Sequence, residues 1–429
     1  MINLLVIVFI LFGIKSILLS KNGIENSIQW IIFAFVLGYR TFEPVAGLKI
    51  HPIEIFIYLS IFRALLFKPI KYTKIPKVIS ILGVLFLTMY LIDIFTRYNP
   101  IVLLEFKNAI LLYMVFYMVQ FIQINDSLFI KYMKTYLFSA TFISFLGILE
   151  YLFPSFIASI FGFDHIYNFN LESIFFSRLA FLFWGSHLAA NLIAPVFPIM
   201  ILLKYVKDPI LKNNIILTGF ILLNLFAIYL SGNRISWLIL TAMLILTLFQ
   251  FRKSLIPRLK PFILFISVGF IAYVYSQPVE GRYISTFKAL TGQIDTKYDS
   301  SGGERMARAK MAMSSIMNNP IGTGWGSQGW VHSDVLQIGA SVGIISALIF
   351  FFSPIVLFIQ IFRYYKDAPP DLSILYFCQC NLLIFVIISF LLNGNILKVQ
   401  SGVPLIVLWA LVEGFRQYNR DQYRVLAYG

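Results

Sequence analysis

Residues 321–345 combine chemically useful residue types with a sharp change in polarity. The segment opens with Gly322, Gly324, Gly326 and Gly329. His332 and Asp334 follow where the sequence becomes apolar again. An imidazole has an ordinary pKa of about 6.5, which suits a general base at neutral pH. The segment therefore predicts a turn that delivers His332, as a proton acceptor, to the start of a helix. The alternative is that His332 only caps that helix.

A second group of candidate residues lies upstream, on a helix predicted to begin near residue 301 and to end at Pro320. Residues 301–303, Ser-Gly-Gly, precede Arg305 and Arg308. A glycine-rich start of a helix is an arrangement that binds phosphate. The alternative is an amphipathic helix whose basic side rests against lipid headgroups. The apolar stripe that we predict for this helix comprises Met306, Ala309, Met313 and Ile316.

Arg234 follows the short turn Ser231-Gly232-Asn233 between two apolar segments. An arginine at a helix end can be an interface anchor, because its long side chain reaches the headgroups. The backbone donors of the preceding turn also suit an anion. Both interpretations of Arg234 remain open at this point.

Composition defines the broad class of the protein. Of 429 residues, 59% are hydrophobic and 12% are charged, against about 25% charged in typical soluble domains. Apolar segments of about 20 residues recur along the chain, so we predict an all-α polytopic membrane protein with about 12–13 transmembrane helices, the first a retained span and not a cleaved signal. The predicted spans are 1–20, 27–39, 52–67, 77–96, 101–122, 135–153, 187–205, 213–231, 234–250, 260–276, 334–361, 372–392 and 403–417. Residues 1–429 read as a single membrane domain.

The net charge of +15 is concentrated in every second connection between predicted spans. This is the positive-inside pattern, which accounts for the charge without nucleic-acid binding. It predicts that a first loop, residues 154–186, and a large loop, residues 277–333, face the outside. The turn at 231–234 then lies on the same side. An odd number of spans also puts the N-terminus outside, whereas loss of the short second span would put it inside.

The region from Arg305 to Gly343 resembles the signature of the O-antigen ligase and O-antigen polymerase superfamily. In that family an arginine opens a periplasmic helix, a Pro-x-Gly-x-Gly turn follows, and a histidine leads into the next span. The matching residues here are Arg305, Pro320, Gly322, Gly324, His332, Leu336 and Gly343. Ser231 and Arg234 are similar to the family's Ser-Arg turn at the outer end of a span. Asp334 departs from the family, which has asparagine directly after the histidine.

The resemblance implies a GT-C-like glycosyltransferase of the bacterial inner membrane, with its catalytic loops on the periplasmic side. The donor would be a glycan linked to undecaprenyl diphosphate, and no nucleotide sugar, metal ion or other cofactor would be needed. Arginines would bind the diphosphate in bidentate fashion, and His332 would deprotonate the acceptor hydroxyl. The residues implied as catalytic are His332, Arg305 and Arg234. Those implied in binding the donor diphosphate or sugar are Arg308, Ser231, Asp334, Gly322 and Gly324.

The expected partners are the lipid-linked glycan, a glycan acceptor, membrane lipid and a chain-length regulator protein. A polymerase of O-antigen, capsule or exopolysaccharide repeat units is favoured over a ligase that transfers finished polymer to the lipid A core. A flippase for the same lipid-linked glycan would show internal repeats, which the sequence lacks. A scaffold without catalytic activity would give no reason for Arg234, Arg305 and His332 to share one side.

Several further polar or aromatic residues have two interpretations. Trp325 and Trp330 belong either to an interfacial aromatic belt or to a platform on which sugars stack. Asp93 and Arg97 are four residues apart on a predicted helix, a spacing at which they can pair. Asp334 either orients the ring of His332 or binds a sugar hydroxyl.

Overall fold

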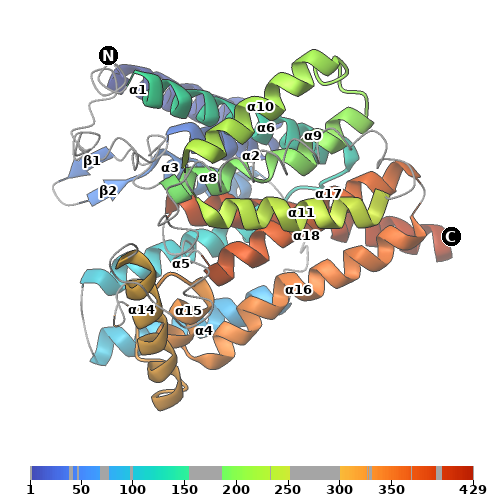
Figure 1. Ribbon diagram of the computed structural model, residues 1–429. Coiled ribbons are helices and arrows are strands. Elements are labelled where there is room, and N and C mark those ends of the chain that lie inside the picture. Colours follow the sequence, from blue (N-terminus) through green and yellow to red (C-terminus); the bar gives the residue numbers. More distant parts are fainter. Residues whose placement is uncertain are drawn as a thin grey trace.

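The chain folds into a bundle of helices with one short hairpin of strands, as the computed structural model shows (Figure 1). The structure describes residues 2–37, 42–45, 48–67, 77–96, 100–153, 186–231, 233–251, 300–325, 327, 331–368, 370–392 and 399–428. The all-α polytopic class is confirmed, since 6 of the described helices are long and apolar enough to cross a membrane. The predicted spans 1–20, 27–39, 187–205 and 234–250 coincide with shorter apolar helices, and residues 260–276 lie outside the described ranges.

The N-terminal part of the bundle packs three helices against one another. Its elements are α1 (Ile2–Leu19), α2 (Gly23–Ala34), the 3-10 turn η1 (Phe35–Leu37), β1 (Phe42–Val45), β2 (Leu48–Ile50) and α3 (Pro52–Phe67). The strands β1 and β2 pair antiparallel. The guanidinium of Arg63 donates hydrogen bonds to the carbonyls of Leu18 and Ser20. It thereby satisfies acceptors that the end of α1 leaves without helical partners.

The next helices are α4 (Lys77–Thr96), α5 (Pro100–Gln120) and α6 (Asp126–Leu152). The start of α6 lies nine residues before the predicted span, because Asn125 caps the helix by accepting a hydrogen bond from the Leu128 N–H at 2.9 Å. Buried Glu54 of α3 pairs with Lys107 of α5 at 3.0 Å. An acidic and a basic residue inside the bundle thus neutralise each other, as intramembrane charges generally do.

The predicted span 187–205 is two helices, α8 (Ser186–Ile193) and α9 (Val196–Tyr205), broken at Pro195. Proline has no N–H and clashes with the preceding helical turn, which explains the break. Two helices follow, α10 (Asn214–Ser231) and α11 (Arg234–Phe251). Their bounds agree closely with the predicted spans 213–231 and 234–250.

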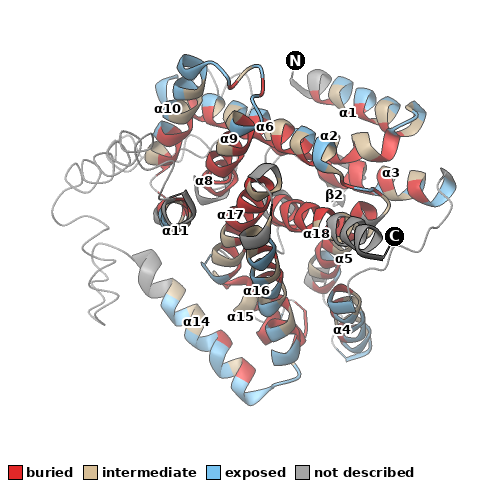
Figure 2. Ribbon diagram, turned by 90° about the vertical axis from the view of Figure 1, so that its right-hand side faces the viewer, coloured by how far each residue is buried: buried red, intermediate tan, exposed pale blue. Residues whose placement is uncertain are grey.

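The C-terminal part comprises α14 (Ser300–Asn318), α15 (Asp334–Val342), α16 (Ile344–Asp367), α17 (Pro370–Leu392) and α18 (Val399–Tyr428). The predicted span 334–361 is broken at Gly343, whose φ of 104° no helix allows. Buried residues are concentrated on α17 and α18, whereas α4 and α14 expose much of their surface (Figure 2). The N- and C-termini lie at opposite ends of the bundle (Figure 1).

Candidate functional site

The chain turns sharply after α14 and packs against the C-terminal end of α15. The hydrogen bonds that join the two run from Thr323 N to Ala340 O (2.8 Å), from Gly324 N to Ser341 O (3.0 Å) and from Ile344 N to Pro320 O (2.9 Å). These bonds satisfy carbonyls that the end of a helix otherwise leaves without partners. The turn and the break at Gly343 therefore form one hydrogen-bonded unit.

Glycine is required at two positions of this turn by backbone geometry. Gly322 has φ of 101° and Gly324 has φ of 98°, which lie in the left-handed region. A Cβ on Gly322 would come within 2.6 Å of the Ser341 carbonyl oxygen. The predicted sharp turn is therefore present, and both glycines serve the close approach of backbone to backbone. The contact of Gly322 and Gly324 with the diphosphate or sugar of the glycosyl donor stays a prediction.

Trp325 closes the turn and is buried, with 2% of its surface exposed. Its ring packs edge-on against Phe86 of α4, with centroids 5.4 Å apart and an interplanar angle of 86°. Its backbone N–H donates to Asp93 Oδ2 at 2.5 Å. The two interpretations of Trp325, an interfacial belt and a sugar platform, are both wrong, because the indole is a packing group between helices. Trp330 and Arg97 lie outside the described residues.

Ser333, and not His332, caps α15. The Ser333 hydroxyl accepts a hydrogen bond from the Leu336 N–H at 3.4 Å, and its backbone is extended. His332 directly precedes this cap and is partly exposed. Asp334 occupies the first turn of α15 and is 1% exposed, so its carboxylate lies within the protein. The cap assigned to Ser333 removes the structural role that the sequence left open for His332.

α14 packs on α15 through a compact apolar cluster. Ala312 and Ile316 form a buried cluster with Val331 and Ala340. Ile316 Cδ1 lies 2.8 Å from where a Cβ on Gly339 would stand, so glycine allows this close approach. The turn joins the C-terminal ends of the two helices, which contact each other.

The packed face of α14 differs from the predicted stripe. Of that stripe, Ile316 is buried, whereas Met306 and Met313 are 43% and 50% exposed, so the stripe is not the face that packs on α15. The spacing of buried Ala312 and Ile316 instead places Arg305, at i−7 from Ala312, on the packed face. Small side chains fit against α15, whereas the longer methionines project away from it.

Arg305 and Arg308 are both partly buried on α14. Arg308 lies one helical turn before Ala312. Ala312 belongs to the same buried cluster as Val331, the residue next to His332. The structure thus brings this arginine and His332 to the same part of the α14–α15 pair. The helix starts at Ser300, so residues 301–303 belong to its first turn and are not a loop preceding it. The predicted glycine-rich start of the helix is therefore present, and its first-turn N–H groups lack helical acceptors; phosphate binding there stays a prediction.

The turn before α11 is held by a buried network. The hydroxyl of Ser231 donates to Ile228 O at 2.6 Å and accepts from Asn233 N at 3.2 Å. Asn233 Oδ1 accepts from the Ile235 N–H at 3.1 Å, which caps α11. Ser231 is fully buried, so its hydroxyl stabilises the turn. Its contact with the diphosphate or sugar of the glycosyl donor stays a prediction. Gly232 and the side chain of Arg234 lie outside the described residues.

The sequence did not single out Asn191 of α8, which fixes this turn to a second helix. Asn191 Oδ1 accepts hydrogen bonds from Asn233 Nδ2 and from Ser236 Oγ, both at 3.1 Å. Asn191 is 4% exposed. A lone asparagine within an apolar stretch was the signal that could have found it. Through this network, Arg234 is placed as the first residue of α11.

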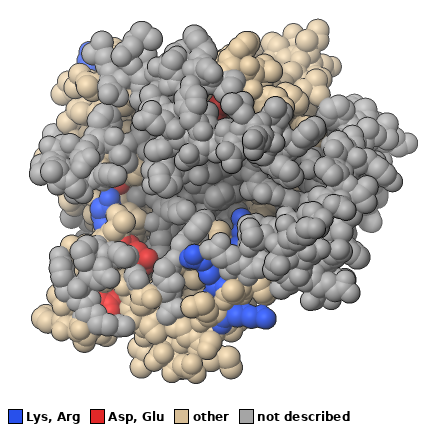
Figure 3. Space-filling view, turned by 60° about the vertical axis from the view of Figure 1, so that its left-hand side comes forward, with Lys and Arg blue, Asp and Glu red and all other residues tan. Residues whose placement is uncertain are grey.

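The N-terminal end of α14 lies toward the start of α11 in both ribbon views (Figures 1 and 2). The starts of these two helices therefore lie on the same side of the bundle, although more than 60 residues separate them in the sequence. Figure 3 looks toward this end of the bundle and shows Lys and Arg side chains gathered in the lower middle of the face. A helix with two partly buried arginines thus packs beside the segment of His332, which suits an anionic group bound next to a hydroxyl that loses a proton.

Residues 219–351 match the family model described as O-antigen ligase. The matched segment runs from α10 into α16, so it includes the start of α11, the whole of α14, the glycine turn and His332. No curated protein matches the chain.

Proposed function

We propose that the chain, whose residues 219–351 match the family model described as O-antigen ligase, transfers a glycan from undecaprenyl diphosphate to a sugar hydroxyl. The anomeric carbon–oxygen bond to the diphosphate breaks as the acceptor oxygen bonds to that carbon. The diphosphate leaves with its negative charge, and the acceptor proton moves to the imidazole of His332. Neither a nucleotide sugar nor a metal ion takes part in this scheme.

Arg234, Arg305 and Arg308 bind the departing diphosphate in this proposal. The planar guanidinium group offers a fork of donors that matches two phosphate oxygens at once. Partial burial of Arg305 and Arg308 strengthens such contacts, because screening by water is reduced. Asp334 retains its two proposed roles, which are to orient the His332 ring or to bind a sugar hydroxyl.

The observation that carries the proposal is the α14–α15 pair. Its packed cluster joins the helix of Arg305 and Arg308 to the segment that ends at His332. Ser333 supplies the helix cap, so the imidazole serves no capping role. A charge-binding group and a proton acceptor are thus supported by one rigid unit, as transfer from a diphosphate requires.

The proposed location is the bacterial inner membrane, with α14 and the turn on the periplasmic side. Repeat units of O-antigen, capsule or exopolysaccharide are the favoured acceptor, and a chain-length regulator is a further proposed partner. A ligase would use the same donor chemistry with the lipid A core as its acceptor.

Reconstitution tests the proposal and separates these acceptors. The purified protein in liposomes receives a lipid-linked repeat unit alone or together with lipid A core. Chains of several units formed without the core support a polymerase, and transfer that requires the core supports a ligase. Consumption of neither substrate, by protein that remains folded, contradicts the proposed transfer.

A further inference from the structure

We infer that Asp93 of α4 is a positioning residue for the proposed glycosyl transfer, because it holds the turn that leads to His332. The inference rests on the proposed role of His332. α4 (Lys77–Thr96) lies well before the matched residues 219–351. The site would therefore depend on a part of the chain that the family match does not cover.

Asp93 is an acidic residue buried near the end of an otherwise apolar helix. It is 1% exposed, and its Oδ2 accepts the hydrogen bond from the Trp325 N–H at 2.5 Å. A carboxylate acceptor gives a shorter and stronger hydrogen bond than a neutral one. Phe86, on the same helix, packs against the indole of Trp325. α4 thus contacts both the backbone and the side chain of the last residue of the turn.

The other end of the connection to His332 is fixed by a different helix. The N–H of Val331 donates to Gln337 Oε1 at 2.7 Å, and Gln337 of α15 is 3% exposed. Trp325 is therefore held by α4, and Val331 is held by α15. A change at either anchor would shift His332, which directly follows Val331.

Packing alone would not select aspartate at this position. A charged residue within a membrane-spanning helix is costly and needs a partner inside the protein. A buried backbone N–H that lacks an acceptor is also costly. The bond between Asp93 and Trp325 satisfies both requirements and joins two segments 232 residues apart. A purely structural role for Asp93 would change the amount of folded protein, whereas a positioning role changes the rate of transfer.

The test compares Asp93→Leu, which removes the acceptor, with Asp93→Asn, which keeps one. Hydrogen exchange of the backbone amides in residues 319–325, kcat, and KM for the lipid-linked donor are measured on reconstituted protein. We expect Asp93→Leu to exchange faster and to lose about 10- to 100-fold in kcat, because small misplacements of a reacting group have effects of this size. Donor KM should change less than about threefold, since the proposed diphosphate contacts come from α11 and α14. Asp93→Asn should retain at least about a third of kcat.

Asn224→Leu is the matched control. It removes the buried hydrogen bond between Asn224 and Ser144, 2.7 Å long, which joins α10 to α6 away from the turn. This variant should lower the melting temperature without faster exchange in residues 319–325. If Asp93→Leu does not fold, Phe86→Leu loosens the same α4 contact without leaving an N–H unpaired, and it should lower kcat several-fold.

Three results would overturn the inference. They are unchanged exchange in Asp93→Leu, faster exchange with unchanged kcat, and equal loss of kcat in Asp93→Asn and Asp93→Leu. An unchanged kcat in Phe86→Leu would also overturn the inference. Failure of the proposed function is recognised separately, because it appears as full activity of a His332→Ala variant and does not depend on exchange at the turn.

Discussion

Gly322 and Gly343 lie against each other where the turn after α14 meets the break between α15 and α16. A Cβ on Gly322 would come within 2.7 Å of the Gly343 nitrogen, and both residues have left-handed φ, 101° and 104°. This approach lets the Pro320 carbonyl accept a hydrogen bond from Ile344 N at 2.9 Å. The contact holds α14 alongside α15 and so sets the relative position of the arginines and His332.

Gly322→Ala should therefore destabilise the protein and reduce transfer. A side chain would be strained by the left-handed φ, at a cost of about 1–3 kcal/mol, and would also collide with the backbone of Ser341. We expect a lower melting temperature in detergent and a loss of most activity. Gly219→Ala in α10 is the control, because no atom lies within 4 Å of the added Cβ. Equal melting temperatures for the two variants would show that the turn tolerates a side chain.

Arg234→Lys and Arg305→Lys should each lose most activity at normal protein levels. Lysine keeps the positive charge but offers no planar fork to two phosphate oxygens. Rates of transfer are compared with binding of a non-hydrolysable lipid diphosphate. Lys310→Arg is a conservative control on the exposed side of α14 and should leave the rate unchanged. Full activity in both lysine variants would make these arginines interface anchors.

Single-cysteine labelling should locate the site on the outer side. The background replaces Cys378 and Cys380, which are free and buried. An impermeant thiol reagent should label cysteines placed at residues 300 and 328 in spheroplasts of a Gram-negative host and should spare one at residue 256.

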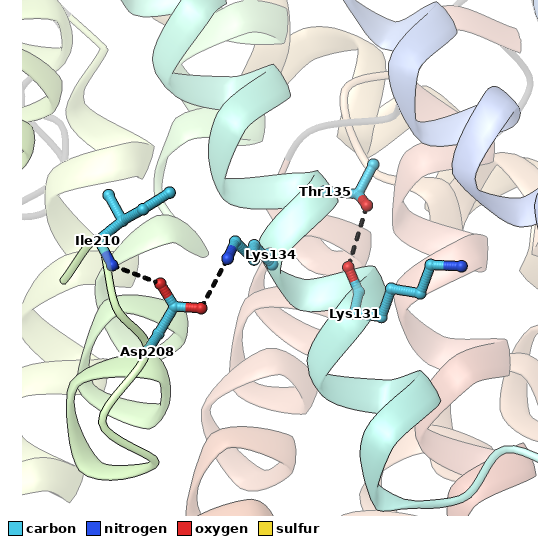
Figure 4. A network of polar contacts seen from close by, with 5 residues as sticks. All are labelled: Lys131, Lys134, Thr135, Asp208 and Ile210. Atoms are coloured by element: carbon cyan, nitrogen blue, oxygen red, sulfur yellow. Dashed lines mark hydrogen bonds and ion pairs between the residues drawn. The ribbon is translucent and has the colours of Figure 1, made fainter.

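The loop between α9 and α10 offers an internal control on the opposite side. It is folded around Asp208, which pairs with Lys134 at 2.7 Å and accepts from Ile210 N at 3.0 Å (Figure 4). A cysteine at Lys207 in this basic loop should be labelled only after the membrane is permeabilised. Labelling at residue 256 in intact cells would reverse the orientation and move the site to the cytoplasmic side.

The helices were predictable because their signals are local. Runs of apolar residues predicted α4 at 77–96 to the residue, and the glycine turn followed from Gly322 and Gly324. The start of α6 was missed, because its first turns are polar and the Asn125 cap was not recognised. Pro195 and Gly343 divide predicted spans into two helices each, since a hydropathy window averages over a single breaking residue.

The contacts between distant segments were not predictable from the sequence. The spacing of Asp93 and Arg97 favours a local pair, which stays a prediction because Arg97 lies outside the described residues. The hydrogen bond that Asp93 accepts from the N–H of Trp325, 232 residues away, had no signal in the sequence. Asn191 stands out as a lone asparagine within an apolar stretch, but nothing near it in the sequence identifies Asn233 of the turn before α11 as its partner. The predicted stripe on α14 includes Ile316, which packs on Gly339, but it omits Ala312, which is buried in the same cluster. Such contacts are set by which helices become neighbours, and hydrophobicity alone does not determine this.

The transfer rate of His332→Ala tests the central claim most directly. Loss of a general base lowers a rate by a factor of about 100 to 10,000, whereas loss of a helix cap costs about 1 kcal/mol of stability and little turnover. Ser333→Ala is the matched control, because Ser333 provides the cap; it should lower the melting temperature and retain most activity. His332→Ala should remain folded, bind the lipid-linked donor and transfer at most about a hundredth of the normal rate. Transfer by folded His332→Ala at more than about a tenth of the wild-type rate would contradict the assignment of His332 as the base.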